Sequence, residues 1–326
     1  MTLLVTGGAG FLGSRLIEAL LRADPSPARV ICLDTAPSPL TDSRVESRIG
    51  SVTDEAFVRD AIRTDAPRTI WHLAAVLSGQ SEAEFERGLS VNVGGTKSLL
   101  DACHGLPHPP RFVFSSTIAV FGGSLPAIVP AGTAVLPQSS YGMAKAIAEL
   151  LVLEYTRRGI ADGVVCRVPT VCVRPGSPNS ALSSFVSGIV REPLAGLPSV
   201  CPVPIDTRLW VSSPDVTTGN LVHAGWMDTT PLGPARIIDL PGITVTPADL
   251  LGALERVGGP GARALVRHEP DPVASRVVAS WPGGLDTTRA LALGFTHDRD
   301  AAAIVAQFVR DRDRAVAGSA PADLVG

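Results

Sequence analysis

Tyr141 and Lys145 stand four positions apart in a segment with helical spacing, and together they have the chemistry of a proton-transfer pair. Residues four apart lie on one face of a helix, so this spacing puts an ammonium beside a phenol. Lowering the pKa of a tyrosine from about 10 to near neutrality takes about 4 kcal/mol, and one cation about 4 Å away supplies that order of energy. We therefore expect Tyr141 to act as a general base. The alternative is an exposed helical tyrosine beside a solvated lysine, but the chain has only two tyrosines and this one lies downstream of a glycine-rich turn.

That glycine-rich turn follows an apolar strand expected near residues 2–6. Gly8, Gly10 and Gly13 have the G-x-G-x-x-G spacing. With Gly7 in place of Gly8, the same run has the spacing G-x-x-G-x-x-G. Glycine lets the chain turn tightly, approach a pyrophosphate closely and pack the following helix against the strand, and the positive N-terminal end of that helix attracts the phosphates. The pattern predicts a dinucleotide site.

Asp34 ends a second apolar strand, expected near 29–33, and follows the last glycine by about twenty residues. A carboxylate at this distance accepts hydrogen bonds from the adenosine ribose hydroxyls. It also repels a 2′-phosphate, and no arginine follows it directly, so NAD is favoured over NADP. A helix cap or a turn is the alternative role for Asp34.

The composition indicates a globular protein without a polyanionic partner. The chain has 326 residues, of which 45% are hydrophobic, and a formal net charge of -3, so we expect neither nucleic acid nor an anionic membrane as a partner. No apolar run reaches the roughly eighteen residues of a spanning helix, and no basic segment typical of a signal peptide precedes the first strand. Five scattered cysteines favour reduced thiols and a cytoplasmic location. No metal site is expected, because the loop from His104 to His108 cannot hold helical ligand spacing.

Apolar strands alternate regularly with helical patterns in the first half of the chain. Strands are expected near 2–6, 29–33, 69–73, 111–115 and 163–168, and helices near 11–23, 54–64, 82–103 and 140–157. This alternation predicts an α/β fold of the Rossmann type, a doubly wound parallel sheet with helices on both faces. Ligands of such sheets bind beyond the carboxyl ends of the strands.

The composition changes after about residue 169, where prolines interrupt Ser-rich and Gly-rich segments. We expect residues 1–168 to form an NAD-binding domain that carries the Tyr/Lys pair. Residues 169–326 are expected to form mostly a smaller substrate lobe, with segments that return to the first domain. The elements expected there are a helix near 180–191, an edge strand near 207–211, a helix near 214–226, a return strand near 236–239 and two or three C-terminal helices. The last dozen residues are expected to fray.

The chain resembles the extended short-chain dehydrogenase/reductase family in the turn T-G-x-x-G-x-x-G and in Y-x-x-x-K. Further landmarks of that family follow in order: His72-Leu73-Ala74-Ala75, Asn92-Val93-Gly94-Gly95-Thr96, and Phe114-Ser115-Ser116-Thr117 with Val120-Phe121-Gly122. The resemblance covers nearly all of the NAD-binding domain and implies hydride transfer with NAD. The family often has Gly-Asp after the third strand, where this chain has Gly50-Ser51-Val52. The adenine contact is therefore expected to be weaker or to come from the Val52 backbone.

The resemblance also implies roles for single residues. Tyr141 and Lys145 would be catalytic, Thr117 would orient the reacting alcohol, and Ser116 beside it would contact the substrate. For the two hydroxyls, a helix cap or a strand end is the alternative role. The implied cofactor contacts are Gly7, Gly10, Phe11, Leu12, Gly13, Asp34, Ser51, Val52, Leu73, Ala74, Ala75, Asn92, Tyr141, Lys145 and Pro169. The helices near 82–103 and 140–157 resemble those through which family members dimerise, which predicts a homodimer.

Three segments of the second half, residues 173–179, 183–196 and 208–214, are similar to those of family members that oxidise a small sugar acid with NAD. Such a substrate needs a guanidinium, which binds a carboxylate bidentately, and polar donors for its hydroxyls. The candidates are Arg174, Arg191 and Arg208 for the carboxylate, and Asn179 and Ser184, with Ser116, Thr117 and Tyr141, for the hydroxyls. For each arginine, a surface or interlobe ion pair is the alternative.

The expected reaction is the NAD-dependent oxidation of a small aldonate, in which Tyr141 removes the proton of the C2 hydroxyl and a 2-oxo acid forms. One alternative is a nucleotide-sugar epimerase or dehydratase that retains NAD and uses the same residues, because the fold does not decide between them. A non-enzymatic NAD-sensing protein is a third alternative, and the intact pair of Tyr141 and Lys145 argues against it.

Overall fold

A seven-stranded sheet forms the centre of the molecule. The computed structural model describes residues 1–24, 26–176 and 181–318, with side chains as far as Arg314. The sheet has the order β10-β6-β5-β4-β1-β2-β3, and every neighbouring pair is parallel. Its strands are β1 (Thr2–Thr6), β2 (Arg29–Asp34), β3 (Val45–Ile49), β4 (Thr69–His72), β5 (Arg111–Thr117), β6 (Asp162–Val168) and β10 (Ile237–Asp239).

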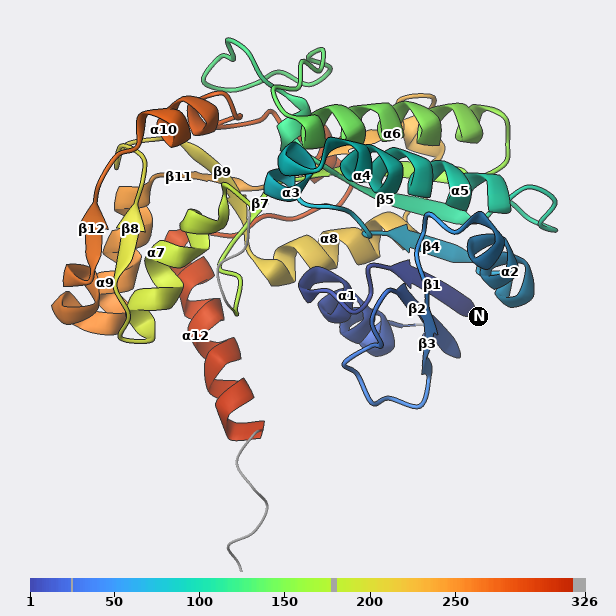
Figure 1. Cartoon of the computed structure of the whole chain (residues 1–326), viewed down its shortest axis with the longest axis horizontal. Coiled ribbons are helices and arrows are strands. Elements are labelled where there is room, and N and C mark those ends of the chain that lie inside the picture. Colours follow the sequence, from blue (N-terminus) through green and yellow to red (C-terminus); the bar gives the residue numbers. More distant parts are fainter. Residues whose placement is uncertain (25, 177–180, 319–326) are drawn as a thin grey trace, which may run out of the picture.

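Helices cover both faces of this sheet. Helices α1 (Phe11–Arg22) and α8 (Pro214–Trp226) lie on one face, and α2 (Glu55–Asp65), α5 (Gly95–Ala102) and α6 (Ser140–Arg157) lie on the other (Figure 1). Successive strand residues point to opposite faces, so Leu3 and Val5 belong to the core under α1 while Leu4 belongs to the core under α6. The expected doubly wound parallel sheet is confirmed.

The helix expected near 82–103 is present from residue 85 to residue 102 as α4 (Phe85–Leu89), the π-helical turn η1 (Ser90–Gly94) and α5, which follow one another without a gap. Its expected start falls in a separate short helix, α3 (Ser78–Ala83). Glu84 has a non-helical backbone between α3 and α4, with φ -126° and ψ 67°. The π-helical turn carries Asn92, whose side chain accepts from the Val76 N–H at 2.8 Å and donates to the Val76 carbonyl at 3.0 Å. The side chain of Asn92 therefore ties this π-helical turn to the loop after β4.

A three-stranded sheet of order β11-β9-β7 lies in the second half of the chain. Its strands are β7 (Thr170–Val171), β9 (Leu209–Ser212) and β11 (Ile243–Val245). The edge strand expected near 207–211 is instead the central one, because β9 pairs with β7 in parallel and with β11 antiparallel. All four residues of β9 are buried, as an apolar central strand requires. A second parallel pair joins β8 (Ser199–Cys201) to β12 (Val266–His268).

The helices of the second half differ in number and bounds from those expected. The helix expected near 180–191 is α7 (Ser184–Leu194), and residues 177–180 lie outside the described residues. Four helices follow β11 in the described chain, rather than two or three: α9 (Pro247–Ala264), α10 (Pro272–Ala279), α11 (Thr288–Ala292) and α12 (Ala301–Gly318). Two short 3₁₀ turns, η2 (Ile118–Val120) and η3 (Thr230–Leu232), complete the elements. The expected fraying of the last dozen residues concerns mostly residues outside the described part.

The chain passes more than once between the large sheet and the smaller lobe. After β9, helix α8 packs against α1 and strand β10 pairs with β6, and the chain then returns to the small sheet at β11. Helix α12, which extends away from the body in Figure 1, is linked back to α1 by an ion pair between Asp311 and Arg15.

The loop between η2 and α6 is bound to the segment after α10. The Val129 N–H donates to the Gly284 carbonyl at 2.9 Å, and the Asp286 N–H donates to the Val129 carbonyl at 2.9 Å.

Among the described helices, none has the length and apolar character that crossing a membrane demands.

Candidate active site

A cleft of about 1140 Å³ lies beyond the carboxyl ends of the parallel strands. Its wall on the side of the large sheet includes Gly7 after β1, Asp34 at the end of β2, Leu73 after β4, Thr117 at the end of β5 and Pro169 after β6. This is the edge at which doubly wound sheets bind their ligands. The opposite wall comes from the segment before α7 and from α10.

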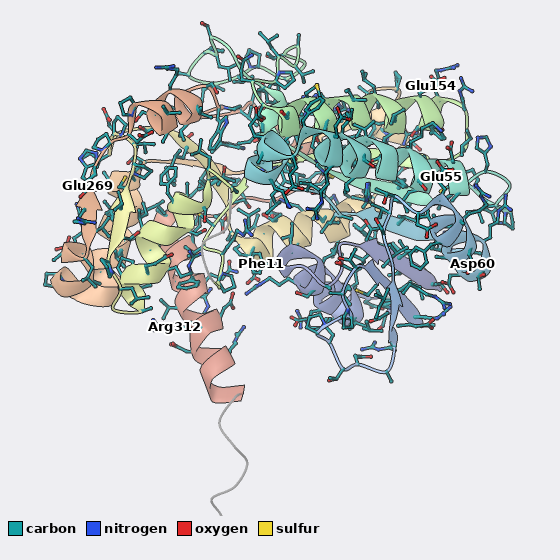
Figure 2. The ribbon with its side chains drawn as sticks, viewed as in Figure 1. Phe11, Glu55, Asp60, Glu154, Glu269 and Arg312 are labelled. Atoms are coloured by element: carbon teal, nitrogen blue, oxygen red, sulfur yellow. The ribbon has the colours of Figure 1, made fainter. Side chains whose placement is uncertain are left out.

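The glycine turn has a conformation that only glycine supports at two positions. Gly7 has φ +70°, and a Cβ at Gly13 would stand 2.0 Å from the Gly7 carbonyl oxygen. Helix α1 then begins with no side-chain cap and no acidic residue in its first turn, so the N–H groups of Phe11 and Leu12 are free of a cap and face the cleft end of the helix. Figure 2 shows Phe11 at the end of α1 that faces the smaller lobe. This backbone fits the pyrophosphate of a dinucleotide.

Asp34 lies beside the glycine turn. Its Oδ2 accepts from the Ala9 N–H at 3.0 Å and its Oδ1 accepts from the Thr35 N–H at 2.6 Å. The carboxylate is partly buried and lines the cleft. Ser51 and Val52, expected near the adenine, line the same end of the cleft. These residues fit the adenosine half of NAD.

The loop after β4 lines the middle of the cleft with Leu73, Ala74 and Ala75. Asn92 is not among the lining residues, because its side chain is turned to the Val76 backbone. Its contribution to this loop is to hold it in place, and the expected direct cofactor contact has no support in the geometry.

His72 supports the same loop from within the core. Its Nδ1 lies 2.7 Å from the Thr6 hydroxyl and its Nε2 lies 2.9 Å from the Thr96 hydroxyl. Burial, with a smaller effect of the Lys145 charge, lowers the pKa of His72 well below its usual value. A neutral imidazole between two hydroxyls fixes the end of β4 without adding charge to the cleft.

Tyr141 and Lys145 lie on one face of α6, as their spacing predicts. Ser139 caps this helix by accepting from the Gly142 N–H at 3.1 Å. The buried Lys145 Nζ donates to the Ser115 carbonyl at 2.8 Å and lies 5.8 Å from the centroid of the Tyr141 ring. Both side chains line the cleft.

The electrostatics of this pair differ from the expectation. Burial raises the pKa of Tyr141 to about 12, and the positive charge that opposes the rise is that of Arg174. Burial lowers the pKa of Lys145 to about 7, opposed by the carboxylate of Glu149. The Lys145 ammonium is turned to the Ser115 carbonyl, and its own pKa is lowered to about 7, so it is not the charge that opposes the rise at Tyr141.

The structure separates the roles of the two neighbouring hydroxyls at the end of β5. The buried Ser116 Oγ donates to Glu149 Oε1 at 2.5 Å. Thr117 lines the cleft, and its Oγ1 accepts from the Ala119 N–H at 3.1 Å. Because Thr117 accepts this bond, its hydroxyl proton can be donated to an oxygen in the cleft. Ser116 also borders the cleft, but its proton is committed to a carboxylate.

The three candidate arginines have different surroundings. Arg174 lines the cleft, is half-buried and forms an ion pair with none of the described carboxylates. Its Cζ lies 5.9 Å from the centroid of the Phe11 ring, and burial lowers its pKa, aided by the neighbouring Arg191. Arg191 pairs with Glu192 at 2.5 Å and donates to the Arg174 carbonyl at 2.8 Å.

Two further substrate candidates, Arg208 and Ser184, do not line the cleft. The exposed Arg208 donates to the Ala127 carbonyl at 3.3 Å, outside the cleft. Ser184, at the start of α7, is not among the lining residues. Asn179 lies outside the described residues.

Several lining residues were missed by the sequence reasoning. Gln80, Glu82 and Arg87 come from α3 and α4, and Val277 and Trp281 come from α10 and its end. No local pattern marks these residues, because only the folded chain brings them to the cleft. A further residue beneath the cleft, Glu149, could have been found, since it continues the four-residue spacing of the Tyr/Lys pair.

Comparison with known proteins agrees with this geometry. The model of the NAD dependent epimerase/dehydratase family matches residues 3–224. The D-erythronate dehydrogenase of Cupriavidus necator is 44% identical over 320 residues, covering 95% of this chain and 98% of that protein. The D-erythronate dehydrogenase of Haemophilus influenzae is 40% identical over 317 residues, covering 95% of this chain and 99% of that protein. The crystal structure of a nucleoside-diphosphate-sugar epimerase from Agrobacterium tumefaciens superposes with a TM-score of 0.90 at 36% identity, covering 96% of this chain and 95% of that one.

The chain belongs to the NAD dependent epimerase/dehydratase family, which is the extended short-chain dehydrogenase/reductase group that its motifs resemble. It is an NAD-dependent dehydrogenase that acts on a CH–OH group, and NAD is its cofactor. The expected family and cofactor are confirmed.

Proposed function

We propose that the enzyme oxidises the C2 hydroxyl of a small aldonate, with D-erythronate as the first candidate and 2-dehydro-D-erythronate as the product. The observation that carries the proposal is Arg174, a half-buried guanidinium in the cleft that has no carboxylate partner in the described chain. A partly buried cation without a counterion favours an anionic ligand. The names of the two similar dehydrogenases from Cupriavidus necator and Haemophilus influenzae support a four-carbon acid.

In the proposed reaction, Arg174 binds the substrate carboxylate and so places the adjacent C2 hydroxyl near Tyr141. Thr117 donates a hydrogen bond to the C2 oxygen, and Tyr141 takes the hydroxyl proton at its phenolic oxygen. NAD, when bound, would supply the hydride acceptor for C2 and a positive charge in the cleft. Lys145, which lines the cleft beside Tyr141, would hold the nicotinamide ribose. The glycine turn and Asp34 would bind the rest of the cofactor, with Pro169 at the nicotinamide end.

The high pKa of Tyr141 sets a condition on this reaction. A phenol with a pKa of about 12 is protonated at neutral pH, so the base form must be favoured by positive charge. The pKa of about 12 already includes the effect of the Arg174 charge, so that charge alone does not produce the base form. We therefore infer that Tyr141 becomes an effective base only in the loaded cleft.

The proposal is tested by NADH formation from NAD and a panel of four- and five-carbon aldonates, with the variant Tyr141→Phe as control. We expect NADH with D-erythronate, and a loss of at least about a thousandfold in the variant, within the range for removal of a general base. Tyr155, the only other tyrosine of the chain, provides the matched variant Tyr155→Phe, since it lies on the outer part of α6 and binds Asp101. It should retain activity.

A nucleotide-sugar epimerase is the second candidate, favoured by the similar structure from Agrobacterium tumefaciens. This reading would require NAD to stay bound and no net NADH to form. Absence of NADH from every acid, together with NAD that co-purifies with the protein, would favour it. A Tyr141→Phe variant that kept its full biological effect would instead favour an NAD-sensing role.

We also propose a homodimer formed through α4, α5 and α6. Three large apolar side chains on these helices are exposed: Phe85 at 45%, Ile147 at 37% and Leu150 at 66%. Their burial in a partner would remove apolar surface from water. Equilibrium sedimentation that shows only monomer at micromolar concentration would reject the dimer.

The five free, buried cysteines fit a cytoplasmic location, which we propose on that ground.

A further inference from the structure

A buried ionic network lies directly beneath the Tyr/Lys pair. The Arg167 guanidinium binds the Glu149 carboxylate through two nitrogens: Nε lies 2.9 Å from Oε1, and Nη2 lies 2.7 Å from Oε2. The same Oε1 accepts from the Ser116 hydroxyl at 2.5 Å. The third nitrogen of Arg167, Nη1, lies 3.4 Å from Asp239 Oδ1. Glu149 and Ser116 are 2% exposed and Arg167 is 6% exposed. The network joins α6, β5, β6 and β10.

Net stability alone does not explain why these charges are buried. Removing two charges from water carries a desolvation penalty that good geometry only offsets, so a buried ion pair adds little net stability by itself. The proposed reaction also leaves Glu149 and Arg167 without a role, because neither lines the cleft. Their position next to two residues that do line it indicates what they hold in place.

Two connections lead from Glu149 to Lys145. The first is mechanical: Glu149 holds the Ser116 hydroxyl, and the preceding residue, Ser115, offers the carbonyl that binds the Lys145 ammonium at 2.8 Å. The second is electrostatic: Glu149 lies one helical turn beyond Lys145, where side chains are neighbours. Its negative charge opposes the loss of the Lys145 proton.

We propose that Glu149, held by Arg167, is a positioning residue for the catalytic pair. It fixes the end of β5 that carries the lysine-binding carbonyl, and its negative charge opposes the loss of the Lys145 proton. The proposal rests on the proposed function for its catalytic consequence only. The state of Lys145 itself can be measured without any substrate.

The charged and titratable groups that face Lys145 are few. Tyr141 and Glu149 face it from α6, and His72 faces it from β4. Arg167 from β6 and Asp239 from β10 act on it through Glu149. His72 is neutral, so Glu149 supplies the negative charge nearest to the ammonium within the described chain.

The chain offers an uncommonly direct test, because its only lysines are Lys97 and Lys145. Lysine labelled with ¹³C at Cε gives two signals, and Lys97→Arg assigns them. Lys97, exposed and paired with Asp101, is an internal reference. The titration of the Lys145 signal is followed in the wild type, in Glu149→Gln and in the matched control Glu154→Gln. Glu154 lies on the outer side of the same helix, where Figure 2 labels it, and pairs with Arg157 and Arg158.

We expect Glu149→Gln to lower the pKa of Lys145 by about one unit, since a negative charge one turn away is lost. Glu149→Asp should restore much of it, and Glu154→Gln should leave it unchanged. In NADH assays the alkaline limb of the kcat/KM profile should move to lower pH by the same amount in Glu149→Gln. The decrease in kcat/KM of Glu149→Gln should come from a lower kcat rather than from a higher KM for D-erythronate, because the substrate does not contact Glu149.

Arg167→Gln provides a second variant should Glu149→Gln not fold. This variant removes the positive charge that partly cancels the negative charge of Glu149. The pKa of Lys145 should therefore rise instead of fall. An unchanged Lys145 titration in Glu149→Gln or in Arg167→Gln would overturn the proposal, whatever the activity of the variant. If the wild type forms no NADH with any aldonate, the proposed substrate fails, while the titration still decides the role of Glu149.

Discussion

Replacing Arg174 by glutamine tests the substrate class through one side chain. The guanidinium is half-buried in the cleft and has no carboxylate partner among the described residues. A carboxylate bound there would gain charge-assisted hydrogen bonds without first displacing another anion. Hydrogen bonds to charged groups contribute about 1.5 to 3 kcal/mol. For Arg174→Gln we therefore expect a loss of about 2 to 3 kcal/mol in transition-state binding of D-erythronate, which is about 30- to 150-fold in kcat/KM.

The assay is NADH formation at saturating NAD, with D-erythronate and with erythritol, which lacks the carboxylate. Wild-type enzyme should prefer the acid, and Arg174→Gln should lose most of that preference while changing the rate with erythritol by less than about fivefold. Arg208→Gln is the matched control, since Arg208 binds the Ala127 carbonyl outside the cleft. An equal loss with both substrates would refute the reasoning, because it would mean that Arg174 acts through Tyr141 or through the fold rather than on a carboxylate.

Other predictions address the cofactor turn and the buried lysine. Gly13→Ala should abolish NAD binding, because its Cβ would stand 2.0 Å from the Gly7 oxygen. In chemical denaturation this variant should lose about 3 kcal/mol of the free energy of unfolding. Gly10→Ala, whose Cβ would stand 3.2 Å from the same oxygen, should lose about 1 kcal/mol or less. Asp34→Ser should weaken NAD binding about tenfold and tighten NADP binding in calorimetry, and unchanged preference would reject the ribose role. The pKa of Lys145 is lowered to about 7 in the folded protein and is about 10.4 in an unfolded chain, so the unfolded chain holds the extra proton between these values and stability rises with pH. Relative to Lys145→Met, the wild type should gain about 1 kcal/mol from pH 7.5 to 8.5 in urea titrations, and a parallel course of the two curves would contradict the burial of this lysine.

The parts of the fold that the sequence predicts well are those in which local pattern and tertiary packing agree. Strand β1 has the expected bounds because a short apolar run ends at a glycine turn, and α6 and α8 begin where expected because Ser139 and Ser213 cap their first turns. The π-helical turn inside the helix expected over 82–103 carries Asn92, whose side chain binds the Val76 backbone, a long-range contact that no local pattern contains. The position of β9 within its sheet depends on strands about 40 residues before it and 30 after it, which periodicity cannot register.

For the candidate site, the sequence indicated the residue types but not their environments. The spacing of Tyr141 and Lys145 placed both on one face, yet the direction of the ammonium toward the Ser115 carbonyl depends on β5. The sequence does not distinguish the three candidate arginines. Only the fold shows that Arg191 forms an ion pair with Glu192, while Arg174 lines the cleft. Burial sets the pKa values of the site, and burial is a property of the assembled chain.

The path of the chain through the two lobes has a consequence for synthesis. The large sheet lacks its edge strand β10 until residue 239 has been made, and the face of α1 lacks its neighbour α8 until residue 226. The ion pair between Arg15 and Asp311 further joins the first helix to the last. A nascent chain that stops after residue 168 would present an open sheet edge and an uncovered apolar helix face to the ribosome exit, where chaperones bind such surfaces. Residues 1–168 therefore lack two elements that complete the large sheet and its helical cover, β10 and α8, and both are made only after part of the smaller lobe.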